Sequence, residues 1–356
     1  MSKWCALLAC ALLACSSSSK GDEAAAAAFD SDAGAPVEAP VRAEREGTKK
    51  TLPAPVTGPL NDGCAPEARA GHQRVSCKDE TAFDVEVPES CAGGGCGVIL
   101  DVPGWSMDGP MEDRHTRMRQ LAGPKGFIVV QPTAPGSPPS WTSGGTLTRD
   151  FDFDATVWGF FDATMKRFGA DPARIHMLGF SQGGMMTFRF LYAHGDVLAS
   201  IAPIAGPDGF SVYDGRIIKE MTPQPPPAHA IPVMYTHGTK DRMLDFEKTA
   251  LPLRDAVLKA YGLASEESIS KGAGFRGGRW KDAGGRVMFE MWDHDFEQGN
   301  LYIGGHCLTG PIADGDGEFL QSEVPFRCLT DRDHPAIDLD LGAEILRFFT
   351  EHPKGS

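Results

Sequence analysis

Apolar, β-branched runs alternate with helical patterns along most of this chain, and that alternation limits the folds available to it. Residues 98–102 (Val-Ile-Leu-Asp-Val) and 127–130 (Phe-Ile-Val-Val) are typical of buried strands, and residues 111–122 between them are expected to be helical. Similar patterns predict strands at 83–87, 175–180, 200–205, 232–237 and 287–292, and helices at 153–168, 183–193, 247–260 and 336–352. Strands and helices in alternation predict an α/β fold with a mostly parallel central sheet and helices on both faces.

The first 15 residues are typical of an export signal. Lys3 precedes an apolar run, residues 4–14, that is too short to span a bilayer. The run ends in Leu-Leu-Ala-Cys at 12–15, which resembles the bacterial lipobox. We therefore expect Cys15 to be lipidated, and Ser16 after it to favour an outer membrane. The alternatives are an ordinary signal peptide and a weaker lipobox match at residues 7–10.

Composition divides the rest of the chain in two. Residues 16–60 are rich in Ala, Ser, Pro and Gly with mixed charge, so they are expected to form a disordered tether. Residues 61–356 are enough for a single large domain, because the chain is 41% hydrophobic and α/β domains often exceed about 250 residues.

The cysteines indicate disulfides. Three of the nine lie in the first 15 residues, which leaves six, and an even number in an exported chain favours pairing. Six cysteines allow 15 pairings. Pairing between neighbours in sequence would give Cys64–Cys77, Cys91–Cys96 and Cys307–Cys328. A zinc site is the competing interpretation, but Cys-x-x-Cys pairs with a His-x-x-x-His spacing are missing, so we expect no metal.

The charge of the chain restricts its partners. A formal net charge of −14 argues against nucleic acid, which requires clustered Lys and Arg to displace counterions. It also argues against electrostatic docking on anionic lipid. Contact with a membrane is therefore expected only through the N-terminal lipid anchor.

Residues 179–184 (Gly-Phe-Ser-Gln-Gly-Gly) lie between an expected strand and an expected apolar helix. In a chain with 42 glycines, a Gly-x-Ser-x-Gly match is weak evidence by itself. The strand–turn–helix setting is what a nucleophile elbow requires, because the serine occupies a strained turn and flanking glycines remove Cβ clashes. The pattern predicts Ser181 as a nucleophile, and its alternative is a plain glycine-rich turn before a helix.

A serine nucleophile needs a base, and the base needs an acceptor that orients it. In proteins with this elbow the order along the chain is serine, acid, histidine. Residues 231–241 predict a strand followed by a turn that carries Asp241, which we expect to be the acid. Asp245 is the second choice.

Four histidines after Asp241 could be the base: His294, His306, His334 and His352. His306 is favoured because it follows an apolar segment in a glycine-flanked loop, where an imidazole could reach the elbow. His294 lies in an acidic stretch and is more typical of a solvated loop. His237 precedes the acid and is expected to be structural.

Two further features concern the oxyanion and the substrate. The expected oxyanion donors are the backbone N–H groups of Gln182 and of Trp105, the latter in the Pro-Gly-Trp-Ser turn at 103–106. Trp105 and Trp141 are also expected to line the mouth of the site and bind substrate, since flat rings bury much area at small entropic cost. The alternative for either ring is packing in the core.

From about residue 91 to residue 352 the chain resembles the polyhydroxybutyrate depolymerase and feruloyl esterase group of the α/β hydrolases. The matching segments are 126–132 (Gly-Phe-Ile-Val-Val-Gln-Pro), 171–176 (Asp-Pro-Ala-Arg-Ile-His), 202–206 (Ala-Pro-Ile-Ala-Gly), 237–241 (His-Gly-Thr-Lys-Asp) and 304–310 (Gly-Gly-His-Cys-Leu-Thr-Gly). In this resemblance the acid and histidine of the family fall on Asp241 and His306.

The chain also departs from that family. The family usually has His-Gly at the oxyanion strand, where this chain has Pro103-Gly104, and Trp-Pro after the histidine, where it has Leu308-Thr309. The resemblance implies an α/β-hydrolase catalytic domain over residues 61–356 that hydrolyses carboxylic esters without a cofactor. The expected substrates are feruloyl-type aryl esters or hydroxyalkanoate oligomers. The rival functions are a peptidase of the prolyl-oligopeptidase type and a non-catalytic binding lipoprotein with the same fold.

Overall fold

The computed structural model describes residues 52–60, 63–141, 153–206, 227–272, 274–311, 324–329 and 339–355. The expected signal peptide, Cys15 and most of the expected tether lie outside these ranges. Residues 52–60, the last part of that tether, contact the domain: Val56 N–H donates to the Lys166 carbonyl (3.1 Å), and Arg167 donates to the carbonyls of Val56 and Gly58. Within the described ranges, every helix is too short or too polar to cross a bilayer.

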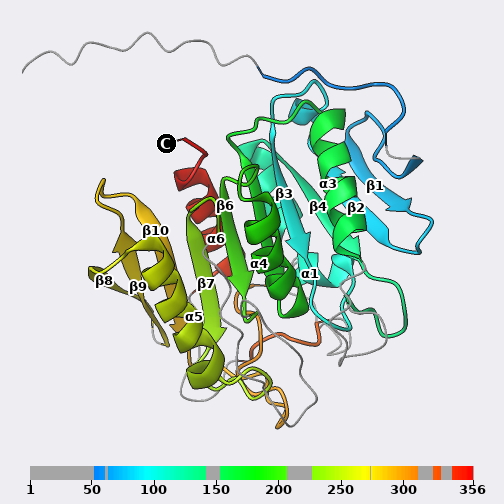
Figure 1. Cartoon of the computed structure of the whole chain (residues 1–356). Coiled ribbons are helices and arrows are strands. Elements are labelled where there is room, and N and C mark those ends of the chain that lie inside the picture. Colours follow the sequence, from blue (N-terminus) through cyan, green and yellow to red (C-terminus); the bar gives the residue numbers. More distant parts are fainter. Residues whose placement is uncertain are drawn as a thin grey trace, which may run out of the picture. The chain divides into compact units, whose positions relative to one another are not determined.

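A ten-stranded sheet forms the centre of the described residues (Figure 1). Its order β1-β2-β4-β3-β5-β6-β7-β10-β9-β8 is parallel from β4 to β10 and antiparallel at both edges. The strands are β1 (Gly71–Ser76), β2 (Ala82–Val87), β3 (Gly97–Val102), β4 (Phe127–Thr133), β5 (Ile175–Phe180), β6 (Ser200–Ile204), β7 (Val233–Gly238), β8 (Glu266–Lys271), β9 (Phe275–Lys281) and β10 (Val287–His294).

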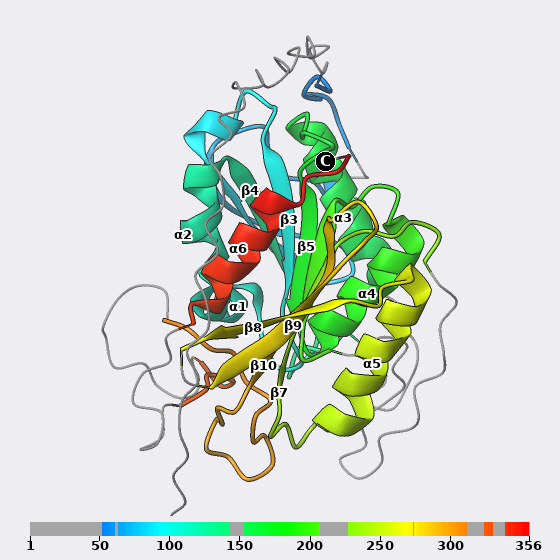
Figure 2. The ribbon, with the colours of Figure 1, turned by 90° about the vertical axis from the view of Figure 1, so that its left-hand side faces the viewer.

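Helices cover both faces of this sheet. They are α1 (Gly109–Thr116), α2 (Met118–Ala122), α3 (Asp154–Arg167), α4 (Gln182–His194), α5 (Phe246–Tyr261) and α6 (Leu341–Glu351). Figures 1 and 2 show α3, α4 and α5 on one face and α1, α2 and α6 on the other. All six residues of β3 and all six of β5 are buried, because a central parallel strand is covered on both sides.

Two apolar cores fill the layers between sheet and helices. The core beneath α3, α4 and α5 includes Phe160 and Phe188, and the core beneath α2 and α6 includes Met118 and Phe348. This architecture confirms the expected α/β fold with a mostly parallel sheet covered on both faces.

The expected helix at 111–122 is broken in two at Arg117. This residue has a left-handed backbone (φ 56°), which ends α1 because the helix cannot continue through it. Its N–H donates to the Asp113 carbonyl, and the Asp113 side chain accepts the N–H of Arg119 in the next helix (3.0 Å). A salt bridge from the Arg117 side chain to Asp340 (2.7 Å) ties the break to α6. Position 117 is not a glycine, the usual marker of such a break, so the break cannot be predicted from the sequence.

The edge strands were not expected from the sequence. In β8 (Glu-Glu-Ser-Ile-Ser-Lys) only Ile269 is even partly buried, so its pattern lacks an apolar period. It exists because β9 pairs with it over its whole length.

The three disulfides join Cys64–Cys77, Cys91–Cys96 and Cys307–Cys328, which confirms pairing between neighbours in sequence. Disulfides are compatible with an exported protein.

Candidate active site

Three loops of the site leave the same edge of the sheet. Ser181 follows β5, Asp241 follows β7, and the loop that carries His306 follows β10. These strands are parallel, so their carboxyl ends lie together, which is where α/β folds place ligands. The topology therefore gathers residues that are up to 125 positions apart in the sequence.

Ser181 occupies a strained turn between β5 and α4. Its backbone has φ 53° and ψ −113°, a conformation that L-residues rarely adopt. The turn passes close to its neighbours: a Cβ at Gly179 would lie 2.6 Å from the backbone of Gly183, and a Cβ at Gly183 would lie 2.0 Å from the Val102 carbonyl oxygen. Both glycines are thus required by contact, as the elbow pattern predicted.

The side chains of Ser181, His306 and Asp241 form a continuous line of hydrogen bonds. Ser181 Oγ lies 2.9 Å from His306 Nε2, and His306 Nδ1 lies 2.6 Å from Asp241 Oδ2. All three residues are buried, with exposed fractions of 9%, 1% and 6%. Since the carboxylate can only accept, the imidazole proton lies on Nδ1 and Nε2 is free to accept the serine proton.

Asp241 is held by four donors. Its Oδ1 accepts the backbone N–H groups of Met243 (2.8 Å) and Leu244 (2.7 Å). Its Oδ2 faces His306 Nδ1 and, at 3.2 Å, His237 Nε2. Burial alone would raise the pKa of this carboxyl, but the His306 charge and the hydrogen bonds from both histidines outweigh it and hold the pKa well below its ordinary value. Asp241 is therefore ionised throughout the neutral range.

The loop before His306 packs directly on the Asp241 turn. Gly304 has φ 56°, and a Cβ there would lie 2.4 Å from the Lys240 carbonyl oxygen. Gly305 N–H donates to that same carbonyl (2.8 Å), and Gly304 pairs with Asp241 in an isolated bridge. The two glycines before His306 thus allow the close approach that brings acid and imidazole together.

The turn after β3 lies against Ser181. A Cβ at Gly104 would come within 3.3 Å of the Ser181 Cβ, so the backbone of this turn borders the nucleophile. Trp105, half-buried, is the next residue. Within the described ranges, the backbone N–H of Trp105 donates to no acceptor. Gln182 is the first residue of α4. The oxyanion role of these two N–H groups stays a prediction.

Trp141 lies in the core and not at the mouth of the site, where the sequence analysis placed it. Its side chain is 1% exposed, and its indole N–H donates to the Pro103 carbonyl (2.7 Å). Its backbone N–H donates to the Gln182 side-chain oxygen (3.0 Å). Because these contacts fix the ring under the turn that carries Trp105, its role is to support that turn.

The strand order decides the fold. A serine elbow follows the fifth strand, and the loops with Asp241 and His306 follow later parallel strands. The fold is that of an α/β hydrolase. No family model matches the chain.

Two curated relatives are esterases. A bifunctional acetylxylan esterase/xylanase of Neocallimastix patriciarum is 26% identical over 151 residues, which are 42% of this chain and 20% of the relative. Feruloyl esterase B of Thermothelomyces thermophilus is 30% identical over 94 residues, 26% of this chain and 32% of the relative. The chain thus spans about a fifth and a third of the lengths of these relatives. Acetyl xylan esterase from Aspergillus awamori aligns in structure with a TM-score of 0.49 at 16% identity, over 64% of this chain and 93% of that one. The expected resemblance to the feruloyl esterase group agrees with these relatives.

The other described candidates for acid and base, Asp245, His294 and His352, have other partners. Asp245 caps α5 by accepting the Lys248 N–H (3.0 Å). His352 Nδ1 bonds the Phe348 carbonyl at the end of α6. His334 lies outside the described residues. His294 is buried, not solvated as expected, because β10 extends to include it.

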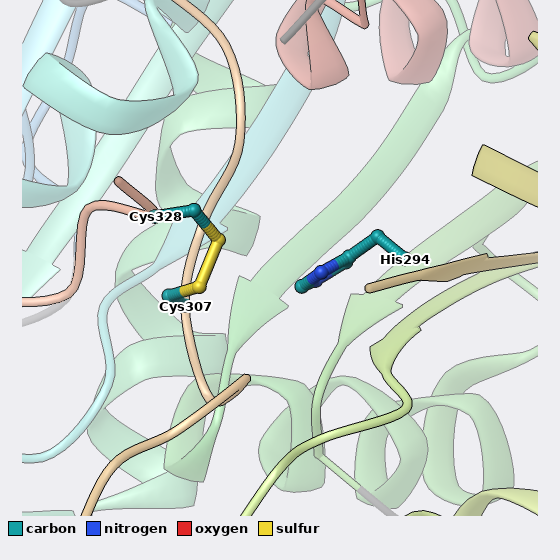
Figure 3. A group of neighbouring side chains, drawn as sticks. All are labelled: His294, Cys307 and Cys328. Carbon is teal, nitrogen blue, oxygen red and sulfur yellow. A yellow bond between two sulfur atoms is a disulfide. The ribbon is translucent and has the colours of Figure 1, made fainter. Parts of the chain in front are cut away.

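His294 lies close to the two sulfurs of the Cys307–Cys328 disulfide (Figure 3). One ligand-type atom from each of the three residues lies within 4.8 Å of the others. The disulfide bond occupies both sulfurs, so this arrangement provides no thiolate for a metal. Burial lowers the pKa of His294 to about 4, and the ring is therefore neutral.

Phe326 is a site residue that sequence reasoning missed. Its ring packs against His306 and Phe180, at centroid distances of 6.1 Å and 5.4 Å, and the Phe180 ring lies 4.9 Å from that of His306. Phe326 belongs to a short segment without apolar periodicity. Its position two residues before Cys328 is the feature of the sequence that could have pointed to it. The Gln182 side chain was missed as well, because its bond to Trp141 depends on a loop 41 residues away.

Proposed function

We propose that this chain hydrolyses carboxylic esters through a covalent acyl-enzyme, with Ser181 as nucleophile, His306 as general base and Asp241 as the acid that orients it. The observation that carries the proposal is the unbroken line of hydrogen bonds, 2.9 Å and 2.6 Å long, from a serine on a strained elbow to an ionised carboxylate. An isolated buried serine or histidine would need no such alignment.

The geometry suits acyl transfer. Ser181 Oγ would attack the ester carbonyl while its proton passes to His306 Nε2. Asp241 stabilises the imidazolium that results and keeps the remaining proton on Nδ1. His306 then gives the proton to the departing alcohol, and a water molecule repeats the sequence to release the acid.

The oxyanion would be stabilised by the backbone N–H groups of Trp105 and Gln182. Gln182 begins a 13-residue helix, whose N-terminus favours negative charge. Trp141 stabilises the turn at Trp105, because it donates hydrogen bonds to the Pro103 carbonyl and to the Gln182 side chain. Rigid donors of this kind stabilise charge without reorganising during the reaction.

The substrate class is proposed as feruloyl-type aryl esters or hydroxyalkanoate oligomers. The names of the relatives, an acetylxylan esterase and a feruloyl esterase, favour the first of these. The half-buried Trp105 beside the oxyanion turn would provide a flat apolar surface for an aryl group. We expect kcat/KM to be higher for methyl ferulate than for a long-chain p-nitrophenyl ester. A strong preference for the long chain would remove this substrate class.

The nucleophile is tested by labelling with a fluorophosphonate probe and by mutation. Ser181→Ala should lose both labelling and turnover, with kcat reduced on the order of 10⁴ to 10⁶-fold. Ser268→Ala, on the exposed edge strand β8, is the matched control and should behave as wild type. Labelling that persists in Ser181→Ala, or a wild-type protein that neither reacts nor turns over esters, would refute the proposal and favour a binding role. Cleavage of amides without esters would favour a peptidase.

Location at the cell envelope is a further part of the proposal, supported by the lipobox-like sequence that ends at Cys15. Full-length precursor expressed in a bacterium should fractionate with membranes, and Cys15→Ala should release it. A mature N-terminus other than a lipidated Cys15 would contradict the anchor.

A further inference from the structure

A second histidine contacts the acid of the site. His237, at the end of β7, has its Nε2 3.2 Å from Asp241 Oδ2 and 2.7 Å from the Leu244 carbonyl oxygen. Its Nδ1 lies 2.7 Å from the Tyr235 hydroxyl. All of these side chains are buried. A chain of hydrogen bonds thus extends from Tyr235 through His237 and Asp241 to His306.

The partners of His237 fix its tautomer. The Leu244 carbonyl can only accept, so Nε2 carries a proton, which it shares between that carbonyl and Asp241. The Tyr235 hydroxyl donates to Nδ1, and burial raises the pKa of this phenol well above its ordinary value, so it keeps its proton. The imidazole is held from both ends and cannot rotate without losing a buried hydrogen bond.

We propose that His237, fixed by Tyr235, is a positioning residue that holds Asp241 in the orientation required by His306 and shares its negative charge. The inference rests on the proposed function. Both histidines donate to the same oxygen, Oδ2, while Oδ1 is held by two backbone N–H groups. Without His237, the carboxylate would direct its charge at His306 alone and would lose one of the contacts that prevent it from rotating.

Other titratable groups surround this chain. Asp293 on β10 pairs in register with His237, and burial raises its pKa to about 6. His294 is the next residue and is neutral. Asp293 would be an alternative acceptor on the neighbouring strand if His237 reoriented, and the hydrogen bonds at both ring nitrogens hold the imidazole toward Asp241 instead. The bonding pattern of His237 therefore favours a role toward Asp241 over simple filling of the core.

Three variants test the inference. His237→Leu removes the donor to Asp241 at similar volume. His237→Gln can keep an amide N–H near the position of Nε2. Tyr235→Phe deletes only the hydroxyl that fixes the ring. The control is His176→Leu. It removes a buried histidine that is bonded to Ser200 and lies near the start of β5, at the end of the strand away from Ser181. All are compared with wild type by kcat and by the pH dependence of kcat/KM.

We expect His237→Leu to lower kcat about tenfold, the effect of losing one hydrogen bond to a charged group. The acid limb of its kcat/KM profile should shift to higher pH by about half a unit. This shift corresponds to threefold tighter proton binding by His306, because the whole charge of Asp241 now stabilises the protonated ring. Tyr235→Phe should move the limb in the same direction by less. His237→Gln should restore most of kcat and the wild-type limb. His176→Leu should reduce stability and leave the limb in place.

The outcomes separate this inference from the proposed function. Unchanged pH profiles in His237→Leu and Tyr235→Phe, with Ser181→Ala inactive, would overturn the positioning role and leave the esterase intact. If His237→Gln and His237→Leu lowered kcat equally and neither shifted the acid limb of the kcat/KM profile, the positioning role would also be overturned and a packing role indicated. If His237→Leu does not fold, Tyr235→Phe decides, because it removes one atom. Activity that persists in Ser181→Ala would instead defeat the proposed function.

Discussion

Replacing Asp241 by Asn tests the site with a change of one atom and one charge. Two backbone N–H groups, from Met243 and Leu244, hold Oδ1 at 2.8 Å and 2.7 Å, and an Asn side chain would keep its oxygen there. Its amide N–H₂ would then take the place of Oδ2 and face His306 Nδ1 and His237 Nε2, both of which are donors now.

A donor in that place forces His306 into the other tautomer. The ring would accept the amide N–H at Nδ1 and carry its proton on Nε2, where it could no longer take the Ser181 proton. Loss of the correct tautomer in a serine–histidine–acid site costs about 10⁴ in kcat, which is about 5.4 kcal/mol at 1.36 kcal/mol for each factor of ten. We expect a loss on the order of 10³ to 10⁴, because the oxyanion donors remain.

The assay is kcat/KM on a short p-nitrophenyl ester, with circular dichroism to show that each variant is folded. Asp245→Asn is the matched control: Asp245 caps α5, Asn caps helices as well as Asp does, and activity should not change. A folded Asp241→Asn that keeps more than a few per cent of the activity would show that Asp241 is not the orienting acid. A severe loss in Asp245→Asn would move that role to Asp245.

Three more changes have defined outcomes. His306→Ala should abolish turnover, whereas His294→Ala, a buried ring without a contact to the nucleophile, should mainly lower the melting temperature; the reverse ranking by steady-state kinetics would exchange their roles. Cys328→Ser removes the disulfide to Cys307, with a sequence separation of 21, and should lower the free energy of unfolding in denaturant by about 3 kcal/mol; an unchanged midpoint would contradict this. Burial raises the pKa of Asp101 from 3.8 to about 7, so the folded state binds its proton more tightly than the unfolded state. The contribution of Asp101 to stability should therefore fall as pH rises from about 4 to about 7, by at most about 4 kcal/mol, so Asp101→Asn should gain stability relative to wild type across this range in melts recorded at matched pH.

The sequence was sufficient for the parts of the site that depend on local pattern. The pattern predicts Ser181 as the nucleophile because an elbow needs glycines at fixed offsets between a strand and a helix, and the structure places those glycines where a Cβ would meet backbone. The pattern predicts Asp241 as the acid because a strand is expected to end just before it. The central strands were visible because burial on both faces leaves continuous apolar runs.

Features that depend on packing between distant segments were not accessible in this way. His294 looked solvated, since its neighbours are acidic, yet β10 runs on and buries it. The loop position of Trp141 predicts a pocket residue, but its indole N–H donates to the Pro103 carbonyl and the ring is buried. The β8 strand has no apolar period and is held by its partner alone.

What the sequence by itself determined is the alternation of strands and helices, the elbow at Ser181 and the chain order of serine, acid and histidine. Local sterics and the period of apolar residues depend on residues that are close together in the sequence, so they can be predicted without the tertiary structure. Only the tertiary structure decided that the two histidines His237 and His306 meet at one oxygen of Asp241. The parallel sheet causes this meeting, because it brings the carboxyl ends of β5, β7 and β10 to one edge. A hydrogen bond depends on distance in space and not on distance along the chain.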